Sequence, residues 1–198
     1  MLPANKTRPL IIFAAFAASL AVGLLITLWM LGGLQKVAAP AAIGGPFQLV
    51  DHNGKTVTEQ NLKGKPTLIF FGFTHCPDVC PTALFEMSEL LRAMGKDGDR
   101  VNAFFVSVDP ERDSVAKMKD YLSSFDPRLK GLTGDPAAVE KVVTGYRVYA
   151  KKVPLKDGDY TMDHTALVYL MDREGRFVRP FDIKRKPEDA ATDLKRYL

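Results

Sequence analysis

The hydrophobic residues of this chain follow three patterns, and each pattern predicts a different kind of element. Between Arg8 and Lys36 lie about 27 uncharged, mostly apolar residues, more than the roughly 20 that a helix needs to cross a bilayer. A nearly all-apolar run at residues 67–73 and a mostly apolar run at 101–108 are typical of strands that are buried on both faces. Apolar side chains at steps of three and four residues over 83–94 indicate an amphipathic helix.

Shorter elements are predicted on either side of these runs. Two alternating runs around Asn53-Gly54 predict a hairpin over residues 47–58. Asp113 or Ser114 is expected to cap the helix that follows the second buried strand. Strands that alternate with helices predict an α/β fold with a mixed sheet and helices on both faces. The remaining helices are predicted at 113–122, 136–144 and 187–198, the remaining strands at 129–133, 146–153, 166–171 and 177–181, and a polar loop at 154–159.

Charges at the two ends of the first apolar segment predict its orientation. Lys6 and Arg8 precede the segment, whereas Lys36 alone follows it closely, so the positive-inside rule places the N-terminus in the cytoplasm. The protein would then be a single-pass protein of a bacterial inner membrane with its C-terminal domain in the periplasm. A cleaved signal peptide, with Ala39-Pro-Ala41 as its cleavage site, is the alternative. The expected parts are a cytoplasmic N-terminus at 1–9, a transmembrane anchor at 10–34, a linker at 35–46 and a folded domain at 47–198.

The composition adds one restriction on partners. The chain carries a net charge of +4 with a pI of about 9.0, but its lysines and arginines are scattered rather than gathered into one run with aromatic residues between them. A scattered basic balance of this kind is typical of a solvated surface. We therefore expect no nucleic-acid partner.

Both cysteines, Cys76 and Cys80, lie four residues apart between the strand at 67–73 and the helix that follows it. A thiol pair at such a junction indicates a thioredoxin-like arrangement, in which the helix N-terminus presents N–H groups and the positive end of its dipole. We therefore predict an α/β fold with a thioredoxin-like mixed sheet flanked by helices, an N-terminal hairpin and a single N-terminal transmembrane helix.

The thiols predict a site for a soft metal. Thiolates suit Cu(I) or zinc, and a specific site needs a third donor. His164 directly precedes the strand at 166–171, and in a thioredoxin-like sheet the loop before that strand packs against the cysteine turn. Cys76, Cys80 and His164 would then form a three-coordinate site matched to Cu(I), or to Cu(II) with further donors. Zinc would need a fourth ligand.

Other uses of the cysteine pair stay open. A structural disulfide is compatible with the spacing. A thiol–disulfide oxidoreductase is a second alternative, although three residues separate the cysteines instead of the usual two. A peroxidase is disfavoured because Pro77 occupies the position where the similar peroxiredoxin motif carries a threonine. Cys76 and Cys80 can also form a redox-active disulfide, and their oxidation would then prevent metal loading.

Several neighbours of these residues have candidate supporting roles. Asp78 and Asp109 are possible hydrogen-bonding partners around the metal site, with a helix-entry role for Asp78 and a turn role for Asp109 as the alternatives. His75 is expected to lie outside the ligand set, and Met162 is expected to serve in packing. The segment at 151–163, rich in lysine, glycine and aspartate, is predicted to be a mobile element that carries His164 at its end.

Three motifs resemble one family. They are Phe73-Thr-His-Cys-Pro-Asp-Val-Cys-Pro81, Val108-Asp-Pro-Glu-Arg-Asp113 and Asp163-His-Thr165, and together they closely resemble the SCO (SenC/PrrC) copper-chaperone family from about Phe47 to the C-terminus. The resemblance implies that Cys76, Cys80 and His164 are copper ligands. It also implies delivery of copper to, or help in assembling, the CuA centre of cytochrome c oxidase, or reduction of partner cysteines there, with the CuA subunit and other copper carriers as partners. A redox or copper sensor is a further alternative.

Overall fold

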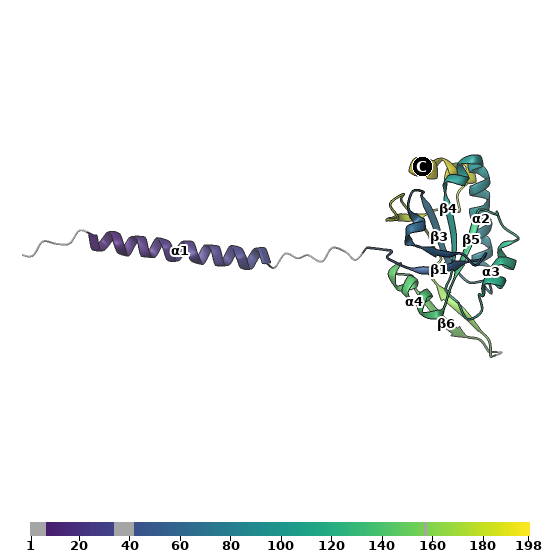
Figure 1. Ribbon diagram of the computed structural model, residues 1–198, viewed down its shortest axis with the longest axis horizontal. Coiled ribbons are helices and arrows are strands. Elements are labelled where there is room, and N and C mark those ends of the chain that lie inside the picture. The colour runs from purple at the N-terminus through teal and green to yellow at the C-terminus, as the bar shows by residue number, and fades with distance from the viewer. Residues whose placement is uncertain (1–6, 34–41, 157) are drawn as a thin grey trace, which may run out of the picture. The chain divides into compact units, whose positions relative to one another are not determined.

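The computed structural model describes residues 7–33, 42–156 and 158–198, and it divides the chain into two compact units, Met1–Ala41 and Ala42–Leu198. The first unit contains helix α1 (Thr7–Gly33) (Figure 1). Within α1, Ile11–Met30 is long and apolar enough to cross a membrane, although a signal sequence would satisfy the same criterion. The expected cytoplasmic residues 1–6 and the linker residues 35–41, together with residue 34 of the expected anchor, lie outside the described residues.

The second unit is built on a seven-stranded sheet with the strand order β2-β1-β5-β4-β3-β8-β9. Strands β3, β4 and β5 run parallel to one another. Strands β1 and β2 on one side, and β8 and β9 on the other, pair antiparallel. The sheet is therefore mixed, as predicted. Its strands are β1 (Gln48–Asp51), β2 (Thr56–Thr58), β3 (Thr67–Gly72), β4 (Asn102–Ser107), β5 (Leu129–Thr133), β8 (Val168–Met171) and β9 (Phe177–Phe181).

Strand β3 is central, and every residue in it is buried. It pairs with β4 on one side and with β8 on the other, so that Phe70 lies opposite Phe105 and Val168. Helices flank the sheet (Figure 1), and the apolar stripe of α2 is buried, with Met87 fully and Met94 almost fully covered. Both methionines belong to the core, as the helical spacing predicts. The helices of this unit are α2 (Val79–Met94), α3 (Val115–Leu122), α4 (Pro136–Gly145) and α5 (Pro187–Leu194), with short 3₁₀ turns at η1 (Glu59–Leu62), η2 (Gly95–Arg100) and η3 (Lys195–Tyr197).

Two boundaries differ from the prediction in ways that affect the site. Helix α2 begins at Val79, four residues before the predicted start, because the apolar periodicity appears only after the first turn, which carries Cys80 and Pro81. Ser114, not Asp113, caps α3, since its side chain accepts a hydrogen bond from the Lys117 N–H. Asp113 is thereby left for a different role.

The segment before β8 also differs. The strand predicted at 146–153 begins only at Ala150, after a turn in which Arg147 adopts a positive φ of 54°. Tyr160–His164 (β7), for which no strand was predicted, pairs with β6 (Ala150–Pro154) as an antiparallel ribbon outside the main sheet, so the predicted loop at 154–159 begins one residue later. His164 is therefore the last residue of a strand and not part of a loop.

Candidate metal centre

The turn between β3 and α2 holds the two cysteines at the edge of the sheet. Cys76 lies in the turn, where its N–H donates to the Phe73 carbonyl at 3.3 Å. Cys80 lies in the first turn of α2, and its N–H donates to Cys76 Sγ at 3.3 Å. Both cysteines are free thiols. An N–H of the first helical turn therefore points at the sulfur of Cys76.

The β6–β7 ribbon brings His164, the last residue of β7, close to the two cysteines. Its Nε2 lies 3.5 Å from Cys80 Sγ, and its Nδ1 lies 3.2 Å from the Thr165 carbonyl oxygen. Because a carbonyl oxygen only accepts, Nδ1 carries the ring proton and Nε2 keeps a free lone pair. The donor atoms of Cys76, Cys80 and His164 all lie within 4.8 Å of one another. The structure thus brings together the three residues that the sequence singled out.

Burial determines the protonation of this cluster. Cys80 is fully buried, and burial raises the pKa of its thiol well above the usual range. Burial also lowers the pKa of His164, so the imidazole is neutral at neutral pH. Two rings, Phe70 and Phe73, pack edge-on against the imidazole with centroids 6.2 and 5.7 Å away. A bound cation would therefore replace the proton of Cys80, and metal binding should release protons.

Gly72, the last residue of β3, makes room for the sulfur of Cys80. A Cβ atom at this position would lie 2.8 Å from Cys80 Sγ and 2.7 Å from the Phe105 ring, closer than such atoms approach. We expect Gly72→Ala to weaken copper binding by roughly 10-fold or more, the scale on which supporting residues of metal sites act. Titration with Cu(I) measures the effect. Gly145→Ala is the matched control, because its Cβ would meet the nearest atom at an ordinary 3.6 Å. Equal affinities of the two variants would contradict this role.

The two carboxylates predicted as supporting residues take different positions. Asp78 is exposed and is the N-cap residue of α2, but its side chain makes no capping hydrogen bond. Asp109 is buried and accepts hydrogen bonds from Arg112 and Tyr160. Among the described residues, neither carboxylate is hydrogen-bonded to a sulfur or to the imidazole, so their supporting roles stay predictions. His75 is exposed and lies outside the cluster.

Asp113 is the supporting residue that sequence reasoning missed. Its side chain is fully buried and accepts hydrogen bonds from the Thr74 hydroxyl and the Ser107 hydroxyl, both at 2.6 Å, and from the Thr74 N–H at 3.2 Å. It thereby fastens the turn before Cys76 to the end of β4. The signal in the sequence was the pair Asp113-Ser114, since only one of two adjacent capping residues can cap the helix.

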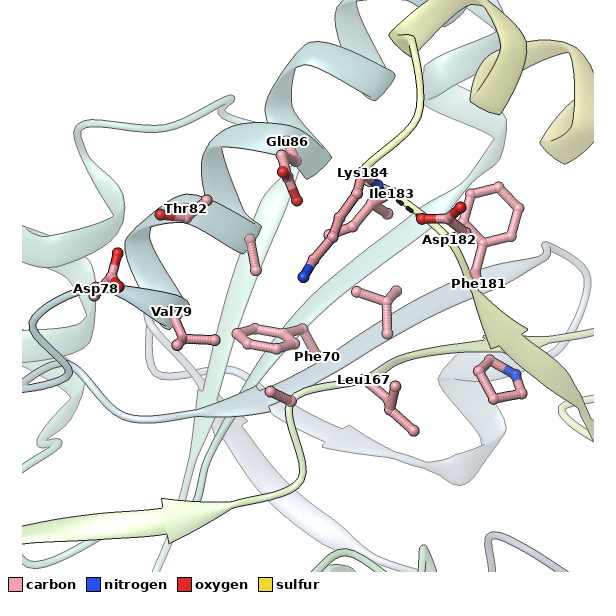
Figure 2. Close-up of a pocket in the computed structure, with 14 residues that line it drawn as sticks. Phe70, Asp78, Val79, Thr82, Glu86, Leu167, Phe181, Asp182, Ile183 and Lys184 are labelled. Atoms are coloured by element: carbon pink, nitrogen blue, oxygen red, sulfur yellow. Dashed lines mark hydrogen bonds between the residues drawn. The ribbon is translucent and has the colours of Figure 1, made fainter.

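A pocket of about 510 Å³ lies directly beside the cluster, between α2 and the chain after β9 (Figure 2). Phe70 forms part of its floor and also packs against His164, so the pocket and the ligand cluster share a wall. Asp78 and Val79 lie on one side of the pocket, and Lys184 projects from the other. A largely apolar hollow therefore lies across the Phe70 ring from His164.

Two thiols and an imidazole that converge at the strand-to-helix junction of a thioredoxin-like sheet define a thioredoxin-like protein with a soft-metal site. The chain belongs to the SCO1/SenC family, whose model matches residues 35–198. The family resemblance carried by the three motifs is thereby confirmed.

Solved and curated relatives agree with this assignment. The chain is 78% identical to Bradyrhizobium japonicum ScoI with copper bound, with a TM-score of 0.78 over 79% of this chain and 100% of that one. It is 42% identical to Arabidopsis thaliana ScoI with copper bound, with a TM-score of 0.71 over 78% of this chain and 97% of that one. Protein SCO1 homolog 1, mitochondrial, of Arabidopsis thaliana is 46% identical over 79% of this chain and 47% of its own length. The chain thus spans about half the length of that relative.

Proposed function

We propose that this protein binds one copper ion through Cys76, Cys80 and His164 and delivers it to, or helps assemble, the CuA centre of cytochrome c oxidase. The observation that carries the proposal is the convergence of the two sulfurs and one ring nitrogen within 4.8 Å. His164 lies 84 positions after Cys80 in the sequence. Local chain geometry alone therefore does not explain why its ring nitrogen meets the two sulfurs.

The donor set favours copper over other metals. Two thiolates and a neutral imidazole are soft or borderline ligands that suit Cu(I), and a further donor would accommodate Cu(II). Structural zinc is normally held by four ligands, whereas the metal-ligand cluster found among the described residues has three. Copper is also the metal bound in the two ScoI structures that resemble this chain.

The position of the site favours transfer over storage. Cys76 is half-buried, and its neighbours His75, Pro77 and Asp78 are exposed, so an incoming thiol can approach the ion from solvent. Two thiolates, one Cu(I) and a neutral imidazole carry a net charge near −1, which a partner with cationic groups would recognise. Stepwise ligand exchange with a cysteine-bearing acceptor such as the CuA subunit, or with another copper carrier, fits this arrangement.

The N-terminal helix would keep the copper site close to a membrane. Ile11–Met30 is long enough to span a bilayer, and Lys6 and Arg8 precede it, which favours a cytoplasmic N-terminus and a periplasmic copper domain in a bacterial inner membrane. Tethering in the same membrane as an oxidase raises the effective concentration of one partner for the other.

Thiol–disulfide exchange with partner cysteines is the second candidate function. It is favoured by the asymmetry of the pair, since Cys76 is half-buried and Cys80 is fully buried. The accessible thiol would attack a partner disulfide and the buried thiol would resolve the mixed disulfide. Oxidation of the pair removes both thiolate ligands, so a copper-loading role and a redox role would compete for the same two sulfurs.

Loss of the gene tests delivery against thiol exchange. We expect a strain without this protein to contain oxidase deficient in CuA copper, and added copper to restore part of the activity. Copper content and activity of the purified oxidase measure this. Complementation with Cys76→Ser should fail under either function, whereas His164→Ala should fail only if the protein carries copper. Full complementation by His164→Ala would contradict copper delivery and support thiol exchange.

A further inference from the structure

The ribbon that carries His164 is not a strand pair of the main sheet. Strands β6 and β7 form a separate two-stranded sheet, with Ala150 opposite His164 at one end and Pro154 opposite Tyr160 at the other. At its base, the Thr165 N–H donates to the Tyr149 carbonyl at 2.9 Å. The position of the imidazole therefore depends on whatever fixes this ribbon against the rest of the domain.

Arg112, in the segment between β4 and α3, binds the ribbon along β7. Its Nη1 donates to the Tyr160 carbonyl at 2.8 Å, and its guanidinium carbon lies 3.7 Å from the centre of the Tyr160 ring. Its Nε donates to Asp109 Oδ2 at 2.5 Å, while the Tyr160 hydroxyl donates to Asp109 Oδ1 at 2.9 Å. Arg112, Asp109 and Tyr160 thus form a closed set of contacts, which we call the ribbon clamp.

Burial makes this clamp stronger than an ordinary surface ion pair. The side chain of Asp109 is 2% exposed and that of Arg112 is 16% exposed, so the charges are screened little by water. A second contact, between Lys152 of β6 and Glu111 at 2.8 Å, joins the same two parts of the chain, but both of its side chains are exposed. Exposed pairs contribute little, which makes Arg112 the main attachment.

Arg112 and the His164 imidazole also pack against the same aromatic ring, that of Phe73. The guanidinium carbon lies 5.8 Å from the centre of the Phe73 ring, and His164 packs edge-on against the same ring at 5.7 Å and 90°. Phe73 is 1% exposed. The clamp therefore reaches His164 both along the backbone of β7 and through a buried aromatic side chain.

We propose that Arg112 is a positioning residue that holds His164 against the two sulfurs and so sets how firmly the third copper ligand is held. This inference rests on the proposed function, because it takes His164 as a copper ligand. Arg112 Nη2 is buried without a hydrogen-bond partner among the described residues, so the guanidinium leaves the donors of this nitrogen unused while it makes the contacts to the ribbon. Loosening the clamp would free His164 without moving either cysteine, which is the first step that ligand exchange requires.

A double-mutant cycle on the full-length protein in detergent tests the proposal. We expect Arg112→Gln to weaken Cu(I) binding by about 10–100-fold, the range for residues that orient a metal ligand, and to change affinity by less than about 2-fold when His164 is already alanine. Arg112→Lys keeps the charge but not the planar fork, so it should give a smaller loss and serves if Arg112→Gln does not fold. Lys152→Gln, at the exposed pair, is the matched control and should bind like the wild type.

A readout without metal separates this proposal from the ligand assignment. In the metal-free protein, the imidazole NMR signals of His164 should move in Arg112→Gln, whereas those of His52, whose Nδ1 accepts from the Gly131 N–H, should not. The proposal is overturned if the His164 signals stay in place, or if Arg112→Gln weakens Cu(I) binding as much in the His164→Ala background as in the wild type. If His164→Ala alone leaves Cu(I) affinity unchanged while the NMR signals move, the ligand set of the proposed function is wrong, although the clamp positions the ring.

Discussion

Replacing Cys80 with serine is expected to abolish tight Cu(I) binding. A serine hydroxyl is a hard donor that stays protonated, so the ion would keep one thiolate and one imidazole. The loss should exceed the roughly 10–100-fold cost of removing a residue that merely supports a ligand. Anaerobic titration of the full-length protein against a competing Cu(I) chelator measures the affinity, and the wild type should bind one equivalent.

Two further variants make this result specific. Cys76→Ser removes the other thiolate at a half-buried position and should cause a comparable loss with less disturbance of the core. Met162→Leu removes a sulfur atom close to His164 and nearly conserves volume, so it should leave the affinity unchanged if that methionine only packs. Wild-type affinity in Cys80→Ser, or a large loss in Met162→Leu, would show that the ligand set is different.

The sequence predicted the fold where one physical pattern dominated. The mostly apolar runs at 67–73 and 101–108 became β3 and β4, and the Asn53-Gly54 turn became the β1–β2 hairpin, because burial and turn geometry act locally. Only half of the ribbon was predicted. The alternation over 146–153 indicated a strand that overlaps β6 (Ala150–Pro154), whereas β7 (Tyr160–His164) was missed, because it is held by pairing with β6 and by the clamp to Arg112 rather than by an apolar pattern of its own.

The sequence predicted the three candidate ligands of the site but not the residues that hold them in place. Cys76 and Cys80 are the only cysteines, and His164 precedes a strand that must neighbour theirs, so topology alone suggested their meeting. The roles of Arg112 and Asp113 depend on where their side chains point after the loop behind β4 folds. Spacing along the chain contains no information about that direction, and Asp113 looked like a helix cap.

Asp113 matters because it is a buried carboxylate that serves three donors. The Thr74 N–H, the Thr74 hydroxyl and the Ser107 hydroxyl all donate to its side-chain oxygens. The backbone carbonyl of Asp113 separately accepts a hydrogen bond from the Thr133 hydroxyl at 2.7 Å. We expect Asp113→Ala to lower the free energy of unfolding by about 2–5 kcal/mol, since each donor left buried without a partner costs about 1–3 kcal/mol. Urea unfolding followed by circular dichroism measures it; Asp135→Ala, which removes an exposed helix cap, should cost only about 1 kcal/mol.

The pH dependence of the protein's stability tests how strongly burial affects the Asp113 carboxyl group. Burial raises the pKa of Asp113 in the folded protein, although its hydrogen bonds partly oppose the shift. A carboxyl group whose pKa is higher in the folded state binds its proton more tightly there, so its contribution to stability is complete below about pH 4, the pKa of an unfolded aspartate, and falls as the pH rises through the folded-state pKa. Asparagine does not titrate. The stability of the wild type relative to Asp113→Asn should therefore decrease between pH 4 and pH 7, and an increase over that range would mean that the hydrogen bonds outweigh burial.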